Sequence, residues 1–218
     1  MNKALALALV LAGAATASLA QDVKPNADEG RKKMAMCIGC HGIYHYQTAF
    51  PEVYKVPKIS GQTAKYIASS LVAYRSGERR HPSMRGIAQS LSDQDIADLA
   101  AVYSANAPEG TDAVPEQPPA PLPEVAALLT KGACASCHGA NFTKPIDPAY
   151  PKLAGQHADY LYAALKSYQI ENKPVVGRVH AIMGPQTKPF SHGELKAISN
   201  YIGSLPGEMA TVPEPRFR

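Results

Sequence analysis

The chain has 218 residues, with 22 Lys or Arg against 18 Asp or Glu, and its formal net charge is +4 at pH 7. The basic residues occur in both halves of the chain, and nothing in their pattern indicates a nucleic acid partner. This length suits two domains of about 90 residues each, which is small for a hydrophobic core that must be stable on its own.

The N-terminus has the pattern of a secretory signal peptide. Lys3 precedes an apolar run over residues 4–19, which closes in Ser-Leu-Ala, a suitable cleavage site. We expect residues 1–20 to be removed, so that the mature chain begins at Gln21. The run is shorter than the roughly 20 apolar residues that cross a bilayer, and no later segment is apolar enough to do so. The alternative is that the run stays as an uncleaved anchor.

The first half of the mature chain has the periodicity of helices. Helices are predicted over residues 27–40 and 62–75, and Gly77 is placed as the C-cap of the second. A third helix begins at Ser92, which forms a capping-box pattern with Asp95. No segment alternates as a half-buried strand would, so the predicted fold class is all-α.

The second half repeats the first in three blocks of matching residues, which stand 97, 94 and 99 positions apart. The matches are Cys37–His41 with Cys134–His138; Pro57, Lys58, Gly61, Gln62, Tyr66, Leu71 and Tyr74 with Pro151, Lys152, Gly155, Gln156, Tyr160, Leu165 and Tyr168; and His81, Met84 and Ser92 with His180, Met183 and Ser191. The repeat predicts two tandem domains, residues 21–106 and 124–218. Residues 107–123 between them are rich in proline, so we expect either a semi-rigid strap or a flexible tether.

Each copy contains the pentapeptide Cys-x-x-Cys-His, as Cys37, Cys40 and His41 and as Cys134, Cys137 and His138. Two thiols at this spacing can each form a thioether with one vinyl group of a porphyrin, and the following His then lies beneath the iron. The motifs predict two covalently bound haem c groups, with His41 and His138 as proximal ligands. A bare Cys-x-x-Cys also suits a zinc site or a redox dithiol, but the wide separation of the pairs and the His after each disfavour both.

Methionines are the expected sixth ligands. Met84 and Met183 follow the motif histidines by 43 and 45 residues, each in a segment that we expect to be an irregular loop. Their equivalence in the repeat favours them, as does the Met/His ligation usual in electron-carrying cytochromes c. The alternative ligands are His81 and His180, three residues earlier in each copy.

Other residues are expected to support the haem sites or the fold. Pro57 and Pro151 are placed to lend a carbonyl to the haem-ligating His of each copy. Gln62 and Gln156 are interpreted as helix-start residues, and Met209, which has no counterpart in the first copy, as a packing or surface residue. Four tyrosines either pack in the core or bind haem propionates, namely Tyr66, Tyr74, Tyr160 and Tyr168.

The chain resembles the dihaem cytochrome c4 family in three features. These are the two haem motifs, a Pro-Lys-x-x-Gly-Gln element in each copy, and the sequence Ser-Asp-x-Asp-Ile-x-Asp-Leu-Ala after Met84. The resemblance covers nearly all of the mature chain. It implies two cytochrome c domains related by a pseudo-twofold axis, haem propionates that face the interface, and fast electron exchange between the irons. The chain departs from the family in residues 42–56, a longer loop that is either a partner surface or a cover for the haem edge.

The resemblance implies electron transport outside the cytoplasmic membrane. In bacteria c-type haem is attached there, which agrees with the signal peptide and predicts a periplasmic location. The expected donor is a quinol-oxidising complex or a dehydrogenase, and the expected acceptor is a terminal oxidase. No transmembrane segment is expected after signal removal, and peripheral association with the membrane is left open.

Two other classes of function remain as alternatives. The chain is also similar in layout to the electron-accepting subunit of flavocytochrome c sulfide dehydrogenase, in which catalysis takes place on another polypeptide. A further alternative is a haem enzyme, such as a dihaem peroxidase or a thiosulfate dehydrogenase. That chemistry needs an open iron or a Cys ligand. Since no cysteine is left over and each copy offers a Met, the prediction is an electron carrier and not an enzyme.

Overall fold

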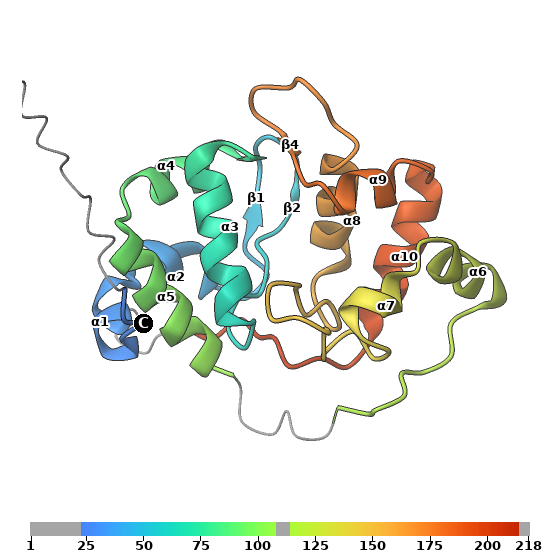
Figure 1. The fold of residues 1–218 in the computed structure, drawn as a ribbon, viewed down its shortest axis with the longest axis horizontal. Coiled ribbons are helices and arrows are strands. Elements are labelled where there is room, and N and C mark those ends of the chain that lie inside the picture. The colour runs from blue at the N-terminus through green and yellow to red at the C-terminus, as the bar shows by residue number, and fades with distance from the viewer. Residues whose placement is uncertain (1–22, 108–113, 214–218) are drawn as a thin grey trace, which may run out of the picture.

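The computed structural model describes residues 23–107 and 114–213. The predicted signal peptide of residues 1–20 and the predicted mature start at Gln21 lie outside the described residues. The chain forms two helical domains that lie side by side, one from each half of the sequence (Figure 1).

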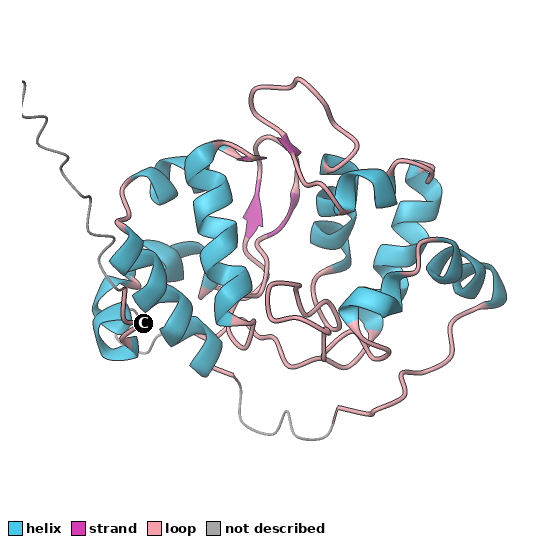
Figure 2. Cartoon of the chain, in the orientation of Figure 1, coloured by secondary structure: helices cyan, strands magenta, loops and turns pink. Residues whose placement is uncertain are grey.

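Helices dominate both domains. The first domain contains α1 (Ala27–Lys33), α2 (Ala35–His41), β1 (Gln47–Thr48), β2 (Tyr54–Lys55), α3 (Ala64–Ser76), β3 (Arg79–Arg80), α4 (Pro82–Gln89) and α5 (Asp93–Ala105). The second contains α6 (Pro123–Lys131), α7 (Cys134–His138), α8 (Ala158–Ser167), β4 (Gly177–Arg178), α9 (Met183–Thr187) and α10 (His192–Ser204). Every described strand has two residues, so the all-α prediction is confirmed (Figure 2).

The helix ends follow local signals in the sequence. Ser92 and Asp95 form a capping box at the start of α5, and Ser191 and Glu194 form the same box at the start of α10. Gly77 ends α3 with a φ of 89°, a left-handed conformation that glycine adopts without steric cost. The single helix predicted over residues 27–40 is instead two helices, which meet at the buried Met34.

Each domain has its own hydrophobic core. In the first, α1 crosses α5 so closely that a Cβ on Gly30 would lie 2.1 Å from the backbone oxygen of Asp98. The carboxylate of Asp98 is 1% exposed and accepts hydrogen bonds from the Asn26 N–H at 2.9 Å and from Lys33 Nζ at 2.8 Å. These bonds anchor α1 on α5. In the second domain, α8 and α10 pack around Phe142, Leu161, Leu195, Ile198 and Ile202.

Reciprocal contacts join the domains and show the pseudo-twofold relation that the resemblance implies. β3 pairs antiparallel with β4 across the boundary, which places Arg79 opposite Arg178. Gln62 and Gln156 precede α3 and α8 as expected, but each side chain also reaches the backbone of the other domain. Their interpretation as helix-start residues alone is therefore incomplete.

The loop of residues 42–56 forms the hairpin β1–β2 and lies against the second domain. The backbone N–H and the Nζ of Lys55 both donate to Asp159 in α8, each at 3.1 Å. The Tyr54 and Tyr160 rings lie 5.9 Å apart between centroids, and Glu52 forms an ion pair with a lysine of α8. One side of this loop is thus an interdomain contact, which neither sequence interpretation anticipated.

Within the predicted linker of residues 107–123, Pro123 already begins α6, and the described residues 114–122 before it are bound to the second domain. Asn141 Nδ2 donates to the Pro115 carbonyl at 3.3 Å, and the Tyr201 hydroxyl donates to the Pro119 carbonyl at 2.8 Å. These bonds favour the strap over the flexible tether for that part of the linker. None of the helices in residues 23–107 and 114–213 is long and apolar enough to cross a membrane.

Candidate haem-binding sites

A proline carbonyl orients the histidine of each Cys-x-x-Cys-His motif. His41 ends α2, and its Nδ1 lies 2.8 Å from the carbonyl oxygen of Pro57. His138 ends α7, and its Nδ1 lies 3.0 Å from the carbonyl oxygen of Pro151. A carbonyl can only accept, so Nδ1 carries the proton in both rings and Nε2 keeps its lone pair for a metal. The predicted role of the two prolines is thus present in the geometry.

The electrostatics of the motif residues suit ligation of an iron. Burial lowers the pKa of His41 and of His138, and the hydrogen bond to proline offsets this only in part, so both imidazoles are neutral. Burial also raises the pKa of the Cys37 and Cys134 thiols, unlike the lowered pKa of a reactive dithiol. Among the described residues, no group of three or more His, Cys, Asp or Glu side chains is arranged to hold a metal ion.

Met84 and Met183 lie on short helices, so the prediction of irregular loops is wrong for both. Met84 lies in the first turn of α4, because Pro82 is favoured at the first position of a helix. Met183 is the first residue of α9. The backbone N–H of each methionine donates to Nδ1 of the histidine three residues earlier, at 3.4 Å for His81 and 3.2 Å for His180. These histidines therefore help to fix the backbone that carries each methionine.

In the second domain the predicted site residues line one open pocket of about 1250 Å³, a volume that includes solvent space at its mouth. Cys134, Cys137, His138 and Met183 all belong to its wall. Much of the remaining wall is aliphatic or aromatic, with Leu153, Leu161, Leu165, Phe190, Leu195, Ile198 and Ile202. Two thiols, an imidazole, a thioether and an apolar cavity together fit a haem c group.

The first domain shows the same local features around its motif. His41 is bound to Pro57 as His138 is to Pro151, and the helix that carries Met84 is held by a histidine in the same way. Cys37 packs against the core that Met34, Ile38 and Leu99 help to form. The equivalence of the two sites thus extends from the sequence to the hydrogen bonds.

Two arginines that the sequence interpretation did not single out lie between the sites. Arg79 Nη2 donates to the Tyr66 hydroxyl and Arg178 Nη2 to the Tyr160 hydroxyl, both at 3.1 Å. Arg79 is 8% exposed, and in the described part of the chain neither arginine forms an ion pair. A guanidinium stays charged, and a buried charge without a counter-ion is costly, so an anionic group is expected beside them.

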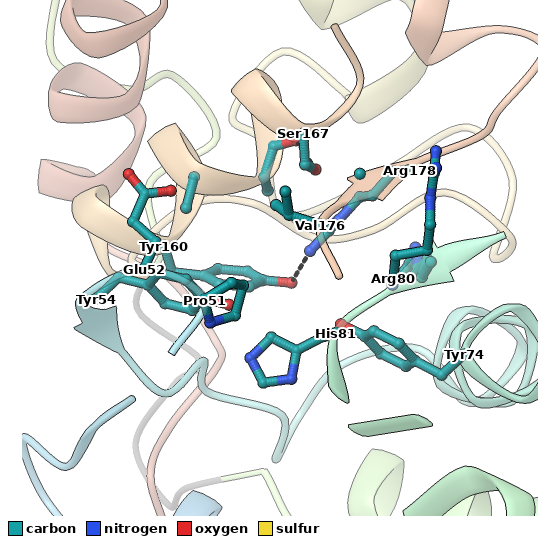
Figure 3. A pocket seen from close by; sticks show the side chains of 14 residues that line it. Pro51, Glu52, Tyr54, Tyr74, Arg80, His81, Tyr160, Ser167, Val176 and Arg178 are labelled. Carbon is teal, nitrogen blue, oxygen red and sulfur yellow. Dashed lines mark hydrogen bonds between the residues drawn. The ribbon is translucent and has the colours of Figure 1, made fainter. Parts of the chain in front are cut away.

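The position of the arginines agrees with haem propionates as that anion. Arg79 and Arg178 both line the pocket that contains the second motif. A smaller pocket at the domain boundary is also lined by both, and Figure 3 shows Arg178 bonded to Tyr160 with Arg80 beside it. The signal for these arginines was present in the sequence, since they stand 99 positions apart, the same offset as Met84 and Met183.

Comparisons with known proteins agree with this geometry. The family model described as cytochrome c matches residues 27–101 and 124–206. Cytochrome c4 from Azotobacter vinelandii is 31% identical over 222 residues, which cover 94% of this chain and 100% of that protein. The thiosulfate dehydrogenase electron acceptor from Stutzerimonas stutzeri is 29% identical over 208 residues, which cover 91% of each chain. The crystal structure of reduced cytochrome c4 from Pseudomonas stutzeri has a TM-score of 0.60 at 25% identity and covers 84% of this chain and 100% of that one.

Each match to the family model contains one Cys-x-x-Cys-His motif. The chain therefore has two tandem cytochrome c domains and carries two covalently bound haem c groups. It is a dihaem electron carrier and not an enzyme. This chain belongs to the cytochrome c family and, within it, to the dihaem cytochromes c4.

Proposed function

We propose that the chain is a periplasmic shuttle that takes electrons from a quinol-oxidising complex or a dehydrogenase and delivers them to a terminal oxidase. The observation that carries the proposal is the equivalent set of residues in the two domains, His41 with Met84 and His138 with Met183. The haem groups supply reversible one-electron chemistry. Met84 and Met183 would complete the ligation of the irons and leave no position for a substrate, so electrons would pass without any substrate bond being made or broken.

The protein residues have distinct roles in this proposal. Thioethers attach the two haem groups to four cysteines, Cys37, Cys40, Cys134 and Cys137. The imidazoles of His41 and His138 would bind the irons through Nε2, because the proline carbonyls occupy Nδ1. The thioether sulfurs of the two methionines donate weakly, which favours the ferrous state and raises the potential.

The proposal includes an arrangement along the chain. The signal peptide comprises residues 1–20, and the two cytochrome c domains comprise residues 21–106 and 124–218, with residues 107–123 as the linker. The signal pattern supports export to the periplasm. Peripheral association with the membrane stays part of the proposal, because quinol-oxidising complexes and terminal oxidases are membrane complexes.

The arginines are assigned to the haem propionates, which gives a testable prediction. Arg178→Gln removes a positive charge that favours the reduced state, so the potential of the second haem should fall by on the order of 0.05–0.1 V. Redox titration followed by haem methyl resonances in NMR spectra reports each haem separately. Lys188→Gln makes the same change of charge at a side chain that is 79% exposed and should shift neither potential appreciably. Equal shifts in the two variants would contradict the assignment.

The test of the shuttle function is electron delivery to an oxidase. The reduced holoprotein is mixed with washed membranes that contain a terminal oxidase, and its visible α-band is followed in air. We expect rapid oxidation of both haems, which cyanide stops because it blocks the oxidase. Absence of oxidation above the rate without membranes would contradict this function.

A second candidate function is electron acceptance from a dehydrogenase on another polypeptide. The relative described as a thiosulfate dehydrogenase electron acceptor aligns with nearly the whole chain, which favours this candidate. Flavocytochrome c sulfide dehydrogenase has the same division of roles. Reduction of the oxidised holoprotein by a purified thiosulfate dehydrogenase and thiosulfate, at a rate that depends on both, would support the second candidate.

A further inference from the structure

Gln62 and Gln156 each bind a backbone segment of the opposite domain. Gln62 Nε2 donates to the Lys152 carbonyl at 3.0 Å, and its Oε1 accepts from the Lys152 N–H at 3.0 Å. Gln156 makes the same two bonds with Lys58, at 2.8 and 3.0 Å. Both glutamines are 5% exposed, so water does not replace these bonds readily.

The peptide groups that the glutamines bind are those that hold the motif histidines. Pro151 and Lys152 are consecutive, so the carbonyl that accepts from His138 and the N–H that donates to Gln62 belong to one peptide group. The first domain has the mirror arrangement, with His41, the peptide of Pro57 and Lys58, and Gln156. Each histidine is thus connected through one peptide group to a glutamine of the other domain.

Hydrogen bonds in such a chain strengthen one another. When the peptide N–H donates to the glutamine Oε1, electron density moves toward the proline carbonyl oxygen, which becomes a better acceptor. A stronger bond from Nδ1–H makes the imidazole a more basic ligand. A more basic ligand stabilises ferric iron and lowers the potential of the haem.

Met209 fixes the two glutamines relative to each other. Its sulfur lies 3.2 Å from Gln62 Nε2 and 3.9 Å from Gln156 Nε2, and its side chain is buried. The next residue, Ala210, donates its N–H to the Ser60 carbonyl of the first domain at 3.0 Å. The segment after α10 therefore packs against the domain interface, where the Met209 sulfur contacts both glutamine amides.

We propose that Gln62 and Gln156 are cross-domain positioning residues, each of which sets the strength of the proximal hydrogen bond, and hence the potential, of the haem in the opposite domain. This inference rests on the proposed function, because it requires that His41 and His138 ligate the irons. It gives the domain interface a role in redox tuning. If one domain shifts relative to the other, its glutamine moves as well. The proximal hydrogen bond of the haem in the other domain then changes.

The test is a pair of mirror-image substitutions in the holoprotein, Gln62→Leu and Gln156→Leu, which remove the amide. Redox titration followed by haem methyl resonances gives the reduction equilibrium of each haem. Gln62→Leu should shift the second haem toward reduction by about twofold to tenfold and leave the first within twofold. Gln156→Leu should do the reverse.

Two further variants separate this role from general damage to the interface. Lys65→Gln removes a cross-domain ion pair with Asp147, at 3.1 Å between exposed side chains, without contact with either proximal peptide. It should shift neither haem. Gln62→Glu keeps an acceptor for the Lys152 N–H and makes it a stronger one. It should therefore shift the second haem in the direction opposite to that of Gln62→Leu.

The outcomes distinguish this inference from the proposed function. If Gln62→Leu shifts both haems equally, shifts only the first, or shifts neither, the cross-domain role is wrong even where both irons retain Met/His spectra. If Gln62→Leu and Gln62→Glu shift the second haem in the same direction, the effect is structural damage and the inference also fails. If the unmodified protein lacks Met/His spectra, the proposed ligation itself is wrong.

Discussion

Met183→Ala is expected to abolish the Met-to-iron charge-transfer absorption of one haem and to lower its potential by about 0.1 V or more. The loss follows because thioether ligation favours ferrous iron, and axial ligands span a range of roughly 0.8 V. Met84→Ala should do the same to the other haem. The measurement is the near-infrared and visible spectrum of each oxidised variant, followed by a redox titration.

Met36→Ala is the matched control for the methionine substitutions. Met36 precedes the first motif on α2, and its side chain is 48% exposed, so its removal should leave both charge-transfer bands intact. If the bands survive in both Met84→Ala and Met183→Ala, the methionines are not the ligands. The alternatives His81 and His180 would then be tested in the same way.

A chain with Cys134→Ala and Cys137→Ala together is expected to carry one covalent haem and to lose the order of its second domain. The pocket that contains these cysteines is walled largely by apolar side chains, which need the porphyrin to complete their packing. Its loss should remove most of the ~5–10 kcal/mol that stabilises a domain of this size. Intact-mass spectrometry counts the haems, and urea unfolding followed by circular dichroism measures the loss of stability.

Ser136→Ala provides the control within the same motif. Ser136 is exposed between the two cysteines, and its hydroxyl donates to a backbone carbonyl of its own turn. The substitution should leave two covalent haems and a stability within about 1 kcal/mol of the unmodified protein. A doubly substituted cysteine variant that still showed the mass of two haems would contradict the assignment of the thioethers.

Features that depend on neighbouring residues were predictable from the sequence. The Cys-x-x-Cys-His motifs, the capping boxes of Ser92 and Ser191 and the C-cap at Gly77 each follow from a few adjacent side chains. The internal repeat extended this local information, because it placed Met84 and Met183 at equivalent positions. Pro82 was also a local signal, since proline suits the first position of a helix, and it could have identified α4.

Features that depend on the docking of the two domains were not predictable in this way. Arg79 and Arg178 hold equivalent positions in the repeat, but only the pairing of β3 with β4 makes them neighbours. Gln62 contacts Lys152 across 90 positions of sequence. In the sequence, the hairpin in residues 42–56 was only a departure from the family pattern. Its hydrogen bonds to Asp159 show that one side of it is an interdomain contact. A repeat predicts two similar domains, but their relative orientation depends on side chains at the interface, which no periodicity encodes.

The chain carries two haems, and we propose that each is ligated by a His and a Met. The most direct test is the near-infrared charge-transfer absorption of the oxidised holoprotein, calibrated against its iron content. We expect two irons per chain and a band intensity that corresponds to two Met-ligated ferric haems. A band that corresponds to one such haem, or a high-spin spectrum at either iron, would contradict it and would favour a haem enzyme over an electron carrier.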